Sequence, residues 1–370
     1  MSTVTIGIGH TSLSFDSAPD SADDLCQLAR AFEQTGPDKT LSWLELCTGF
    51  LDFCAQRSTS LALVVFSALN AELERKSLNI HVAVHRLDLG ADSARAVLRS
   101  YYALWDAPDA QPLYQHAASN QQPALLFAES AQLLAIFGGQ RGVGNCLEEA
   151  QQLLDVYGPL LRSYVQRMSE FLGRESRNNQ LASAYPQGFD VLTWLIGSGA
   201  MPDLRYLESM PVMIPAIGLT QLMQVMVLFK TLGVSPGELA RQFKAVTGHS
   251  QGIAIAAVFS MLSDEMSFDE LSTKILGLQM LVGALPQLEY PYYELNPRSV
   301  HSSVSLKDST PYPMALVRGL SQPALEQHIV EFNSRYDSAL EQVYIAVRNT
   351  ASTFIVTGVT LAVARFAEHL

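Results

Sequence analysis

Residues 248–252 read Gly-His-Ser-Gln-Gly, which is the pattern G-x-S-x-G, and this pentapeptide decides how the chain is interpreted. A short strand candidate, 244–247, precedes it, and an apolar helical segment, 253–262, follows it. A serine on such a tight strand-to-helix turn lifts its hydroxyl above the sheet, and the flanking motif positions must be glycine-small to avoid clashes. The helix N-terminus then points at the site. The motif predicts Ser250 as a nucleophile, with a structural glycine-rich turn as the alternative.

A second glycine-containing segment lies upstream of the motif. The wholly apolar run 133–137 is typical of a buried parallel strand, and it stops at Gly138 and Gly139. Acyl transfer through a serine needs two backbone N–H groups that converge on the developing oxyanion. One normally belongs to the residue after the nucleophile, here Gln251, and the other to a loop after a different strand, which Gln140 could supply. The alternative is that the two glycines form only a turn.

The first third of the chain is predicted to be helical. Apolar residues recur at three- and four-residue spacing over 23–33, 41–54, 60–73, 80–87 and 91–104. Polar or Gly/Pro positions separate these segments, and the Ala-, Gln- and Pro-rich stretch 107–122 resembles a linker. We expect a helical N-terminal region over residues 1–121.

The pattern changes after residue 132. Helical patterns at 147–172 and 219–232 alternate with the short strand candidates, and Ser235 with Pro236 reads as a capped helix start. Strands alternating with helices predict an α/β sheet. We therefore expect an α/β core over residues 122–310.

The last sixty residues form a third pattern. Strands are expected at 314–318, 343–348 and 353–357, and helices at 322–333 and 360–370. The order β-α-β-β-α is that of a ferredoxin-like unit without its final strand, which leaves one sheet edge open. We expect an incomplete ferredoxin-like subdomain over 311–370, with the chain ending inside this module.

Composition limits the function classes. The chain has 370 residues, with 24 Lys+Arg against 36 Asp+Glu, so its net charge is −12. At 48% hydrophobic and 16% charged residues it can bury a large core, which argues against extensive disorder. The low charge suggests surface buried against a partner. Nucleic acid is an unexpected partner, because phosphate neutralisation needs grouped Lys and Arg.

Cysteine spacing and hydropathy point to a cytoplasmic protein. The four cysteines form no C-x-x-C pair and no metal spacing, so we expect no metal; Cys47 and Cys54, seven apart, should face one core. No signal-peptide pattern opens the chain. The uncharged stretch 210–229 is long enough to suggest a membrane span, but prolines and glutamines interrupt it. We expect a buried strand-turn-helix there and no membrane partner.

The motifs together resemble a known family. The segments 135–140 (AIFGGQ), 157–159 (YGP) and 247–252 (TGHSQG) resemble the N-terminal acetyltransferase domain of the fungal-type fatty acid synthase β subunit. Further similarity at 189–195 and 354–358 extends the likeness over most of the chain, and the helical first third resembles that subunit more weakly. The pairing of FGGQ with GHSQG at this separation is fairly specific.

The resemblance implies a fold and an activity. It implies an α/β-hydrolase-like acyltransferase core with a nucleophile elbow. Family members transfer a starter acetyl group from acetyl-CoA to the phosphopantetheine thiol of an acyl carrier protein, through an ester on a serine equivalent to Ser250. No bound cofactor is implied. The implied partners are the acyl carrier protein, the rest of the β subunit and the α subunit, in a hetero-oligomer.

The resemblance also assigns site residues. Ser250 is the nucleophile, the backbone of Gln140 and Gln251 forms the oxyanion hole, and Gly138, Gly139, Gly248 and Gly252 shape the loop and elbow. His249 is expected to pack or support the site rather than act as base. Asn349 is expected near the site in an altered turn, because Asn349-Thr350 replaces the family's Asn-Gly. Ile275 stands where related malonyl transferases carry an arginine, which fits an uncharged acetyl group.

Three departures qualify these expectations. Lys274 beside Ile275 leaves the malonyl option open, and Arg141 replaces a further glycine of the family. The family's general base is a histidine roughly 150 positions after the serine, whereas this chain ends 120 residues after Ser250. The downstream residues His301, His328 and His369 do not match that position, and we expect them to be solvated or packing histidines.

Three functions therefore stay open. The favoured one is the acetyltransferase part of a fatty acid synthase β subunit whose remainder lies elsewhere. The second is a starter-unit acyltransferase of a polyketide pathway, which Ser250 disfavours because those enzymes usually carry cysteine. The third is a catalytically inactive chain with an assembly role, suggested by Arg141 and by the unmatched histidine.

Overall fold

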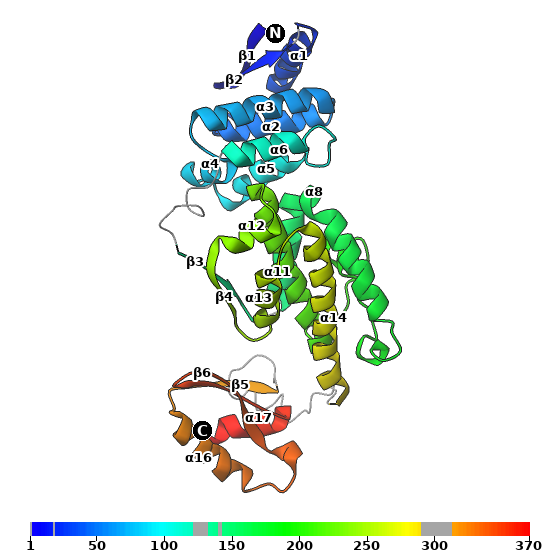
Figure 1. The fold of residues 1–370 in the computed structure, drawn as a ribbon, viewed down its shortest axis with the longest axis vertical. Helices are drawn as coiled ribbons and strands as arrows, with labels where there is room; N and C mark the ends of the chain where they lie inside the picture. The colour runs from blue at the N-terminus through cyan, green and yellow to red at the C-terminus, as the bar shows by residue number, and fades with distance from the viewer. Residues whose placement is uncertain (1, 18, 121–131, 140–142, 290–312) are drawn as a thin grey trace. The chain divides into compact units, whose positions relative to one another are not determined.

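The computed structural model describes residues 2–17, 19–120, 132–139, 143–289 and 313–370. The chain is a mixed α/β protein that divides into two compact units, Met1–Glu289 and Tyr290–Leu370 (Figure 1). The first unit contains two hydrophobic cores, one built mainly by residues before 115 and one by residues 135–284. The second unit has its own core.

The first unit begins with a β-hairpin, β1 (Ser2–Ile8) and β2 (Thr11–Ser17). The strands are antiparallel, with Ile8 opposite Thr11. The expectation of helices alone was therefore incomplete at this point. Along residues 5–8, Thr5 and Gly7 are exposed and Ile6 and Ile8 are buried. Such alternation with a period of two is the signature of a strand.

Six helices follow the hairpin: α1 (Pro19–Gln34), α2 (Trp43–Ala55), α3 (Thr59–Arg75), α4 (Ile80–Arg86), α5 (Ala91–Tyr102) and α6 (Gln111–Asn120). The first five confirm the five expected helical segments. Cys47 and Cys54 are both fully buried in this core, as expected. The linker expected at 107–122 is wrong, because α6 lies there. Its Tyr114 packs against Phe66 with ring centroids 4.4 Å apart, so tertiary packing outweighs the linker-like composition.

The second core is built around α11 (Met210–Leu232), which corrects the strand-turn-helix expected at 210–229. Pro211 lies in the first turn, where a proline costs little. Pro215 has no N–H for the carbonyl of Pro211, and the hydroxyl of Tyr185 donates to that carbonyl at 3.1 Å instead. The helix is long and apolar enough to cross a membrane, but 83% of its most apolar window is buried inside the protein, as in the core helix of a globular unit.

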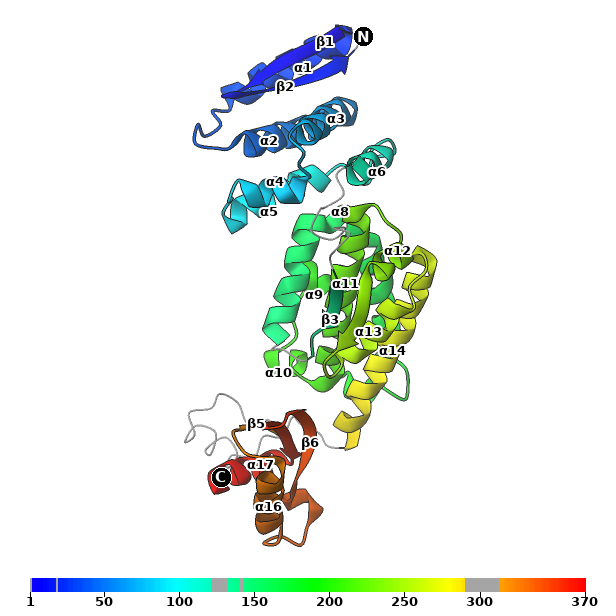
Figure 2. The ribbon, with the colours of Figure 1, turned by 60° about the vertical axis from the view of Figure 1, so that its left-hand side comes forward.

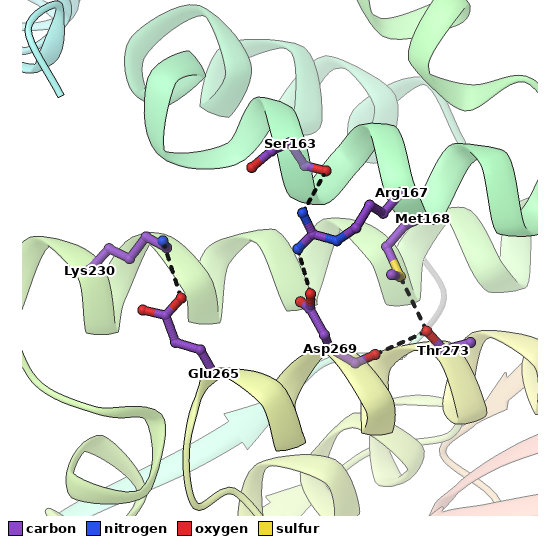
Figure 3. A network of polar contacts seen from close by, with 7 residues as sticks. All are labelled: Ser163, Arg167, Met168, Lys230, Glu265, Asp269 and Thr273. Atoms are coloured by element: carbon purple, nitrogen blue, oxygen red, sulfur yellow. Dashed lines mark hydrogen bonds and ion pairs between the residues drawn. The ribbon is translucent and has the colours of Figure 1, made fainter. Parts of the chain in front are cut away.

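Two long helices, α8 (Val143–Glu175) and α14 (Glu265–Glu289), pack along α11 (Figure 2). Polar contacts also join these helices at their surface (Figure 3). Arg167 of α8 forms an ion pair with Asp269 of α14, and Lys230 of α11 lies 3.5 Å from Glu265 of α14. Exposed pairs of this kind contribute about 1 kcal/mol or less each, so the apolar contacts beneath them hold the layer together.

Shorter elements complete this core: α9 (Val191–Ile196), α10 (Leu204–Leu207), α12 (Pro236–Arg241) and α13 (Gly252–Ser260). Ser235 caps α12 in a capping box with Glu238, as the sequence predicts. The strands β3 (Leu133–Phe137) and β4 (Phe243–Gly248) pair in parallel, with Phe137 opposite Gly248. Both expected strands are thereby confirmed, and their carboxyl ends reach the same edge. The burial expected for β3 is wrong, because Leu134 and Ile136 are exposed in this two-stranded sheet.

The second unit contains β5 (Met314–Arg318), α16 (Gln322–Asn333), β6 (Val343–Thr350), β7 (Thr353–Gly358) and α17 (Thr360–His369). This confirms the expected β-α-β-β-α order. The three strands form one antiparallel sheet in the order β5-β7-β6. Within the residues that the structure describes, β5 pairs on one side only, so its outer edge carries no strand.

A cavity of about 780 Å³ opens inside the first unit between the N-terminal helices and the α8–α11 pair. Several aromatic side chains line it, including Tyr102, Trp105 and Tyr157. His81 of α4 also lines it, and its Nε2 lies 3.0 Å from the hydroxyl of Tyr102. Burial lowers the pKa of His81 to about 4, because the charged ring would lose its hydration there.

This histidine gives a testable pH dependence. His81 stays neutral in the folded chain but is protonated in the unfolded chain below its ordinary pKa of 6.5. Its contribution to stability is therefore present above pH 6.5 and is lost as the pH falls toward 4. We expect a loss of at most about 3 kcal/mol, because one pKa unit corresponds to about 1.4 kcal/mol.

Urea unfolding followed by tryptophan fluorescence between pH 7.5 and pH 4.5 measures this effect. The fall in the free energy of unfolding should be smaller for His81→Gln than for the wild type. His85→Gln, which changes an exposed histidine of the same helix, is the matched control and should keep the wild-type slope. Equal slopes for the two variants would show that His81 does not cause the pH dependence.

Candidate active site

Ser250 lies in the turn between β4 and α13. Its φ is +53°, in the left-handed region, which costs a non-glycine residue about 1–3 kcal/mol and persists only where the surroundings hold it. The N–H of Gly252 donates to the carbonyl of His249 at 2.9 Å, and the N–H of Ile253 to the carbonyl of Ser250 at 3.1 Å, which closes the turn. Ser250 and His249 are exposed at the end of the strand.

Steric crowding explains why the first and last positions of the motif are glycine. A Cβ on Gly248 would lie 2.3 Å from the carbonyl carbon of Gly252. A Cβ on Gly252 would lie 2.3 Å from the carbonyl oxygen of Phe137, at the end of β3. Both obstacles are backbone atoms, which cannot rotate away. Glycine at these positions therefore allows α13 to leave β4 at a sharp angle while touching β3.

The segment after β3 lies directly against the serine turn. The N–H of His249 donates to the carbonyl of Phe137 at 2.9 Å. A Cβ on Gly139 would come within 2.8 Å of the Cβ of Ser250, so only glycine permits this approach. The structure thus brings together Gly138, Gly139, Gly248, Ser250 and Gly252. Gln140 and Arg141 lie outside the described residues.

Gln221, one of the glutamines that interrupt the apolar stretch 210–229, supports this arrangement. Gln221 projects from α11, and its Nε2 donates to the carbonyl of Gly138 at 2.8 Å. It thereby ties the glycine segment to the central helix. The signal available in the sequence was a polar amide inside an otherwise apolar buried helix, which needs a hydrogen-bond partner.

The N-terminus of α13 faces the same place. Gln251 is its N-cap residue, and among the described residues no hydrogen bond uses the N–H of Gln251. Its side-chain Oε1 and Nε2 are also buried without a partner in that part of the chain. Unsatisfied N–H groups and the positive end of the helix dipole favour a negative charge beside this terminus.

Two further residues of the sequence-based prediction belong to α14. Ile275 of α14 is half-buried against the second core, and Leu276 is fully buried in it. Lys274 is exposed, and its Nζ lies 2.6 Å from a carboxylate oxygen of Glu270. This ion pair gives Lys274 a partner within its own helix.

Asn349 belongs to the second unit. It is exposed on β6, at the irregularity where Arg348 pairs with Phe354 and Thr350 pairs with Thr353. His301 lies outside the described residues. His328 and His369 lie next to each other on α16 and α17, with ring centroids 5.9 Å apart.

The chain is similar in sequence to known fungal proteins. The chain is 34% identical over 321 residues to the fatty acid synthase subunit beta of Schizosaccharomyces pombe, an alignment that covers 85% of this chain and 15% of that protein. It is 31% identical over 295 residues to the fatty acid synthase beta subunit aflB of Emericella nidulans, covering 79% of this chain and 13% of that protein. The resemblance to fungal fatty acid synthase β subunits is thereby confirmed, and the chain spans about a seventh of their length.

A family model assigns the chain more narrowly. Residues 135–369 match the family described as starter unit:ACP transacylase in aflatoxin biosynthesis. The match begins inside β3 and runs into α17, so it includes the Gly138-Gly139 segment, the serine turn and the second unit. The chain belongs to the starter unit:ACP transacylase family.

Proposed function

We propose that the chain is the acetyltransferase part of a fungal-type fatty acid synthase, which loads the starter acetyl group from acetyl-CoA onto an acyl carrier protein. The observation that carries the proposal is the serine turn itself. Ser250 is held at φ +53° at the end of a parallel strand, with Gly139 of the neighbouring strand's loop against it. The family match and the fatty acid synthase relatives support the same reaction class.

In this proposal the turn is a nucleophile elbow and the second core is the β3–β4 part of an α/β-hydrolase-like core. A nucleophile elbow needs a strand, a strained residue and a helix in immediate succession, so that the hydroxyl stands clear of the sheet. The segment β4–Ser250–α13 has this order, and both flanking glycines meet backbone atoms that exclude any side chain. The exposure of Ser250 leaves its hydroxyl accessible to a thioester.

The reaction proceeds by two thioester–ester exchanges. The Ser250 oxygen attacks the thioester carbonyl of acetyl-CoA, a carbon–oxygen bond forms, the carbon–sulfur bond breaks, and coenzyme A leaves as the thiol with the serine proton. The phosphopantetheine thiol of the carrier then attacks the serine ester, and the hydroxyl of Ser250 is restored. No cofactor beyond these substrates is consumed.

The oxyanion of each tetrahedral intermediate needs donors that are already in place. We assign one to the backbone N–H of Gln251, which starts α13 and uses no other hydrogen bond among the described residues. The second is the backbone N–H of Gln140, which follows the Gly139 that touches Ser250. Gln221 keeps that segment in position by its hydrogen bond to the carbonyl of Gly138. Removing one such donor typically costs about 10²–10³ in rate.

The proton of the Ser250 hydroxyl requires a general base, which is worth about 10²–10⁴ in rate. The resemblance places this base on a histidine roughly 150 positions after the serine. His249 is expected to support the turn, since its N–H bonds to the carbonyl of Phe137. We propose Ile275 as a residue near the acyl group, with the rest of the β subunit and an α subunit as partners in a cytoplasmic complex.

A second candidate function is starter loading for a polyketide pathway. The family description that matches residues 135–369 favours it, because it names a transacylase of aflatoxin biosynthesis. The two functions differ in the acyl group transferred. An apolar pocket discriminates only weakly between neighbouring chain lengths.

A competition experiment separates them. The chain is incubated with equal amounts of acetyl-, butyryl-, hexanoyl- and octanoyl-CoA and a phosphopantetheinylated carrier protein, and the charged carrier is analysed by intact mass. Predominant acetyl transfer supports the fatty acid synthase function. Predominant transfer of a longer chain supports the polyketide function, and a carrier that is charged equally by the Ser250→Ala variant contradicts both.

A further inference from the structure

Two helices of the second unit bring three metal-binding side chains together. His328 and Glu331 lie three residues apart on α16, and His369 lies in the last turn of α17. One ligand atom from each residue lies within 4.8 Å of the ligand atoms of the other two. His328 and Glu331 share one helix face because residues at i and i+3 are neighbours on a helix surface.

A second observation points to a ligand at this place. The Nε2 of His369 is buried and has no hydrogen-bond partner among the described residues. The His369 ring packs against Phe332 and Phe366, with ring centroids 5.8 Å and 6.1 Å away. A ring nitrogen buried against apolar groups without a partner is costly, and a metal ion bound to this nitrogen would satisfy it directly.

We propose that His328, Glu331 and His369 bind one Zn²⁺ ion. Two imidazoles and one carboxylate are the donor set that Zn²⁺ accepts, with a water molecule in the fourth position of a tetrahedral site. Ligand atoms in such a site are about 3–3.5 Å apart, as follows from metal–ligand lengths of about 2.0–2.2 Å. Small side-chain rotations would shorten the observed separations to this spacing. The largest rotation is that of the exposed Glu331, whose carboxylate now accepts a hydrogen bond from Gln327 at 2.9 Å.

The ion links α16 to α17. These helices contact each other and pack on the same sheet. A bond from each helix to one ion fixes the last turn of α17 against α16. The ion therefore holds the second helix of this unit in place.

Zinc binding to the 370-residue chain, purified without a polyhistidine tag and stripped with a chelator, tests the proposal. Zn²⁺ is titrated in competition with a chromophoric chelator, and Mg²⁺, which prefers oxygen ligands, is the negative metal control. We expect one Zn²⁺ per chain in the wild type. His328→Ala and Glu331→Gln should each weaken the affinity at least tenfold, and both residues are accessible enough to be changed without opening the core.

His10→Ala removes an exposed histidine of the first unit and is the matched control, which should bind zinc as the wild type does. Hydrogen exchange provides a second measurement, in which Zn²⁺ should slow exchange in the last turn of α17 in the wild type but not in Glu331→Gln. The proposal is overturned if the wild type binds no zinc at one ion per chain. It is also overturned if His328→Ala and Glu331→Gln bind zinc as tightly as His10→Ala.

Discussion

Replacing Ser250 with alanine is expected to reduce acylation of the chain and charging of the carrier to background, a loss of at least about a thousandfold. The side chain is exposed at the turn, so the change removes the attacking oxygen and little packing. The left-handed conformation at φ +53° costs alanine about as much as it costs serine, so the backbone strain at the turn stays similar. The measurement is transfer of a labelled acetyl group from acetyl-CoA to the carrier protein.

The control is Ser260→Ala, which changes an exposed serine at the end of α13. Its hydroxyl donates only to the carbonyl of Ala257, so it should leave both acylation and charging at the wild-type level. If Ser250→Ala retained more than a few per cent of the wild-type rate while folding normally, Ser250 would not be the nucleophile.

Replacing Gly252 with alanine is expected to unfold the serine turn. The added Cβ would lie 2.3 Å from the carbonyl oxygen of Phe137 and 2.5 Å from that of Gly138. Because these are backbone atoms, either α13 or β3 must move. Overpacking of this kind costs about 1–3 kcal/mol, and we expect the upper end of that range together with loss of acylation. Chemical denaturation and the carrier-charging assay measure the two effects.

The matched control for Gly252→Ala is Gly138→Ala, at the residue that directly follows β3. A Cβ on Gly138 would meet no atom within 4 Å, so Gly138→Ala should change the stability by less than about 0.5 kcal/mol. The pair separates crowding at the turn from a general effect of replacing glycine. A Gly252→Ala variant as stable and as active as Gly138→Ala would contradict the described packing of α13 against β3.

Local patterns predict those elements whose own residues determine them. The run at 133–137 is short and apolar and stops at Gly138 and Gly139, whereas 314–318 lies between Pro313 and Gly319, and both segments form strands. Helix α11 was misinterpreted because Pro215 normally interrupts a helix, whereas here Tyr185 supplies the missing donor from a distant part of the chain. Helix α6 was missed for a similar reason, since the burial of Tyr114 among other aromatic side chains offsets a linker-like sequence.

The same distinction holds for the site. The motif places Ser250 between two glycines, and the structure supplies the backbone atoms that make those glycines necessary. Gln221 could not be assigned from the sequence, because its partner Gly138 lies 83 positions away. The cluster of His328, Glu331 and His369 was hidden in the same way, since only the packing of α16 against α17 brings the second histidine to the first. The sequence predicts its two histidines, His328 and His369, only as solvated or packing residues.

The central claim is that an acyl group is held on Ser250, and peptide mapping tests it most directly. The 370-residue chain is incubated with acetyl-CoA for several hours and digested with trypsin, which cuts after Lys244 and Lys274 and leaves Ser250 in the peptide 245–274. The account predicts one acetyl group on this peptide, located at Ser250 by fragmentation and removed by the carrier's phosphopantetheine thiol. An acetyl group on another serine of the peptide, or a chain that carries none on residues 245–274, would contradict it.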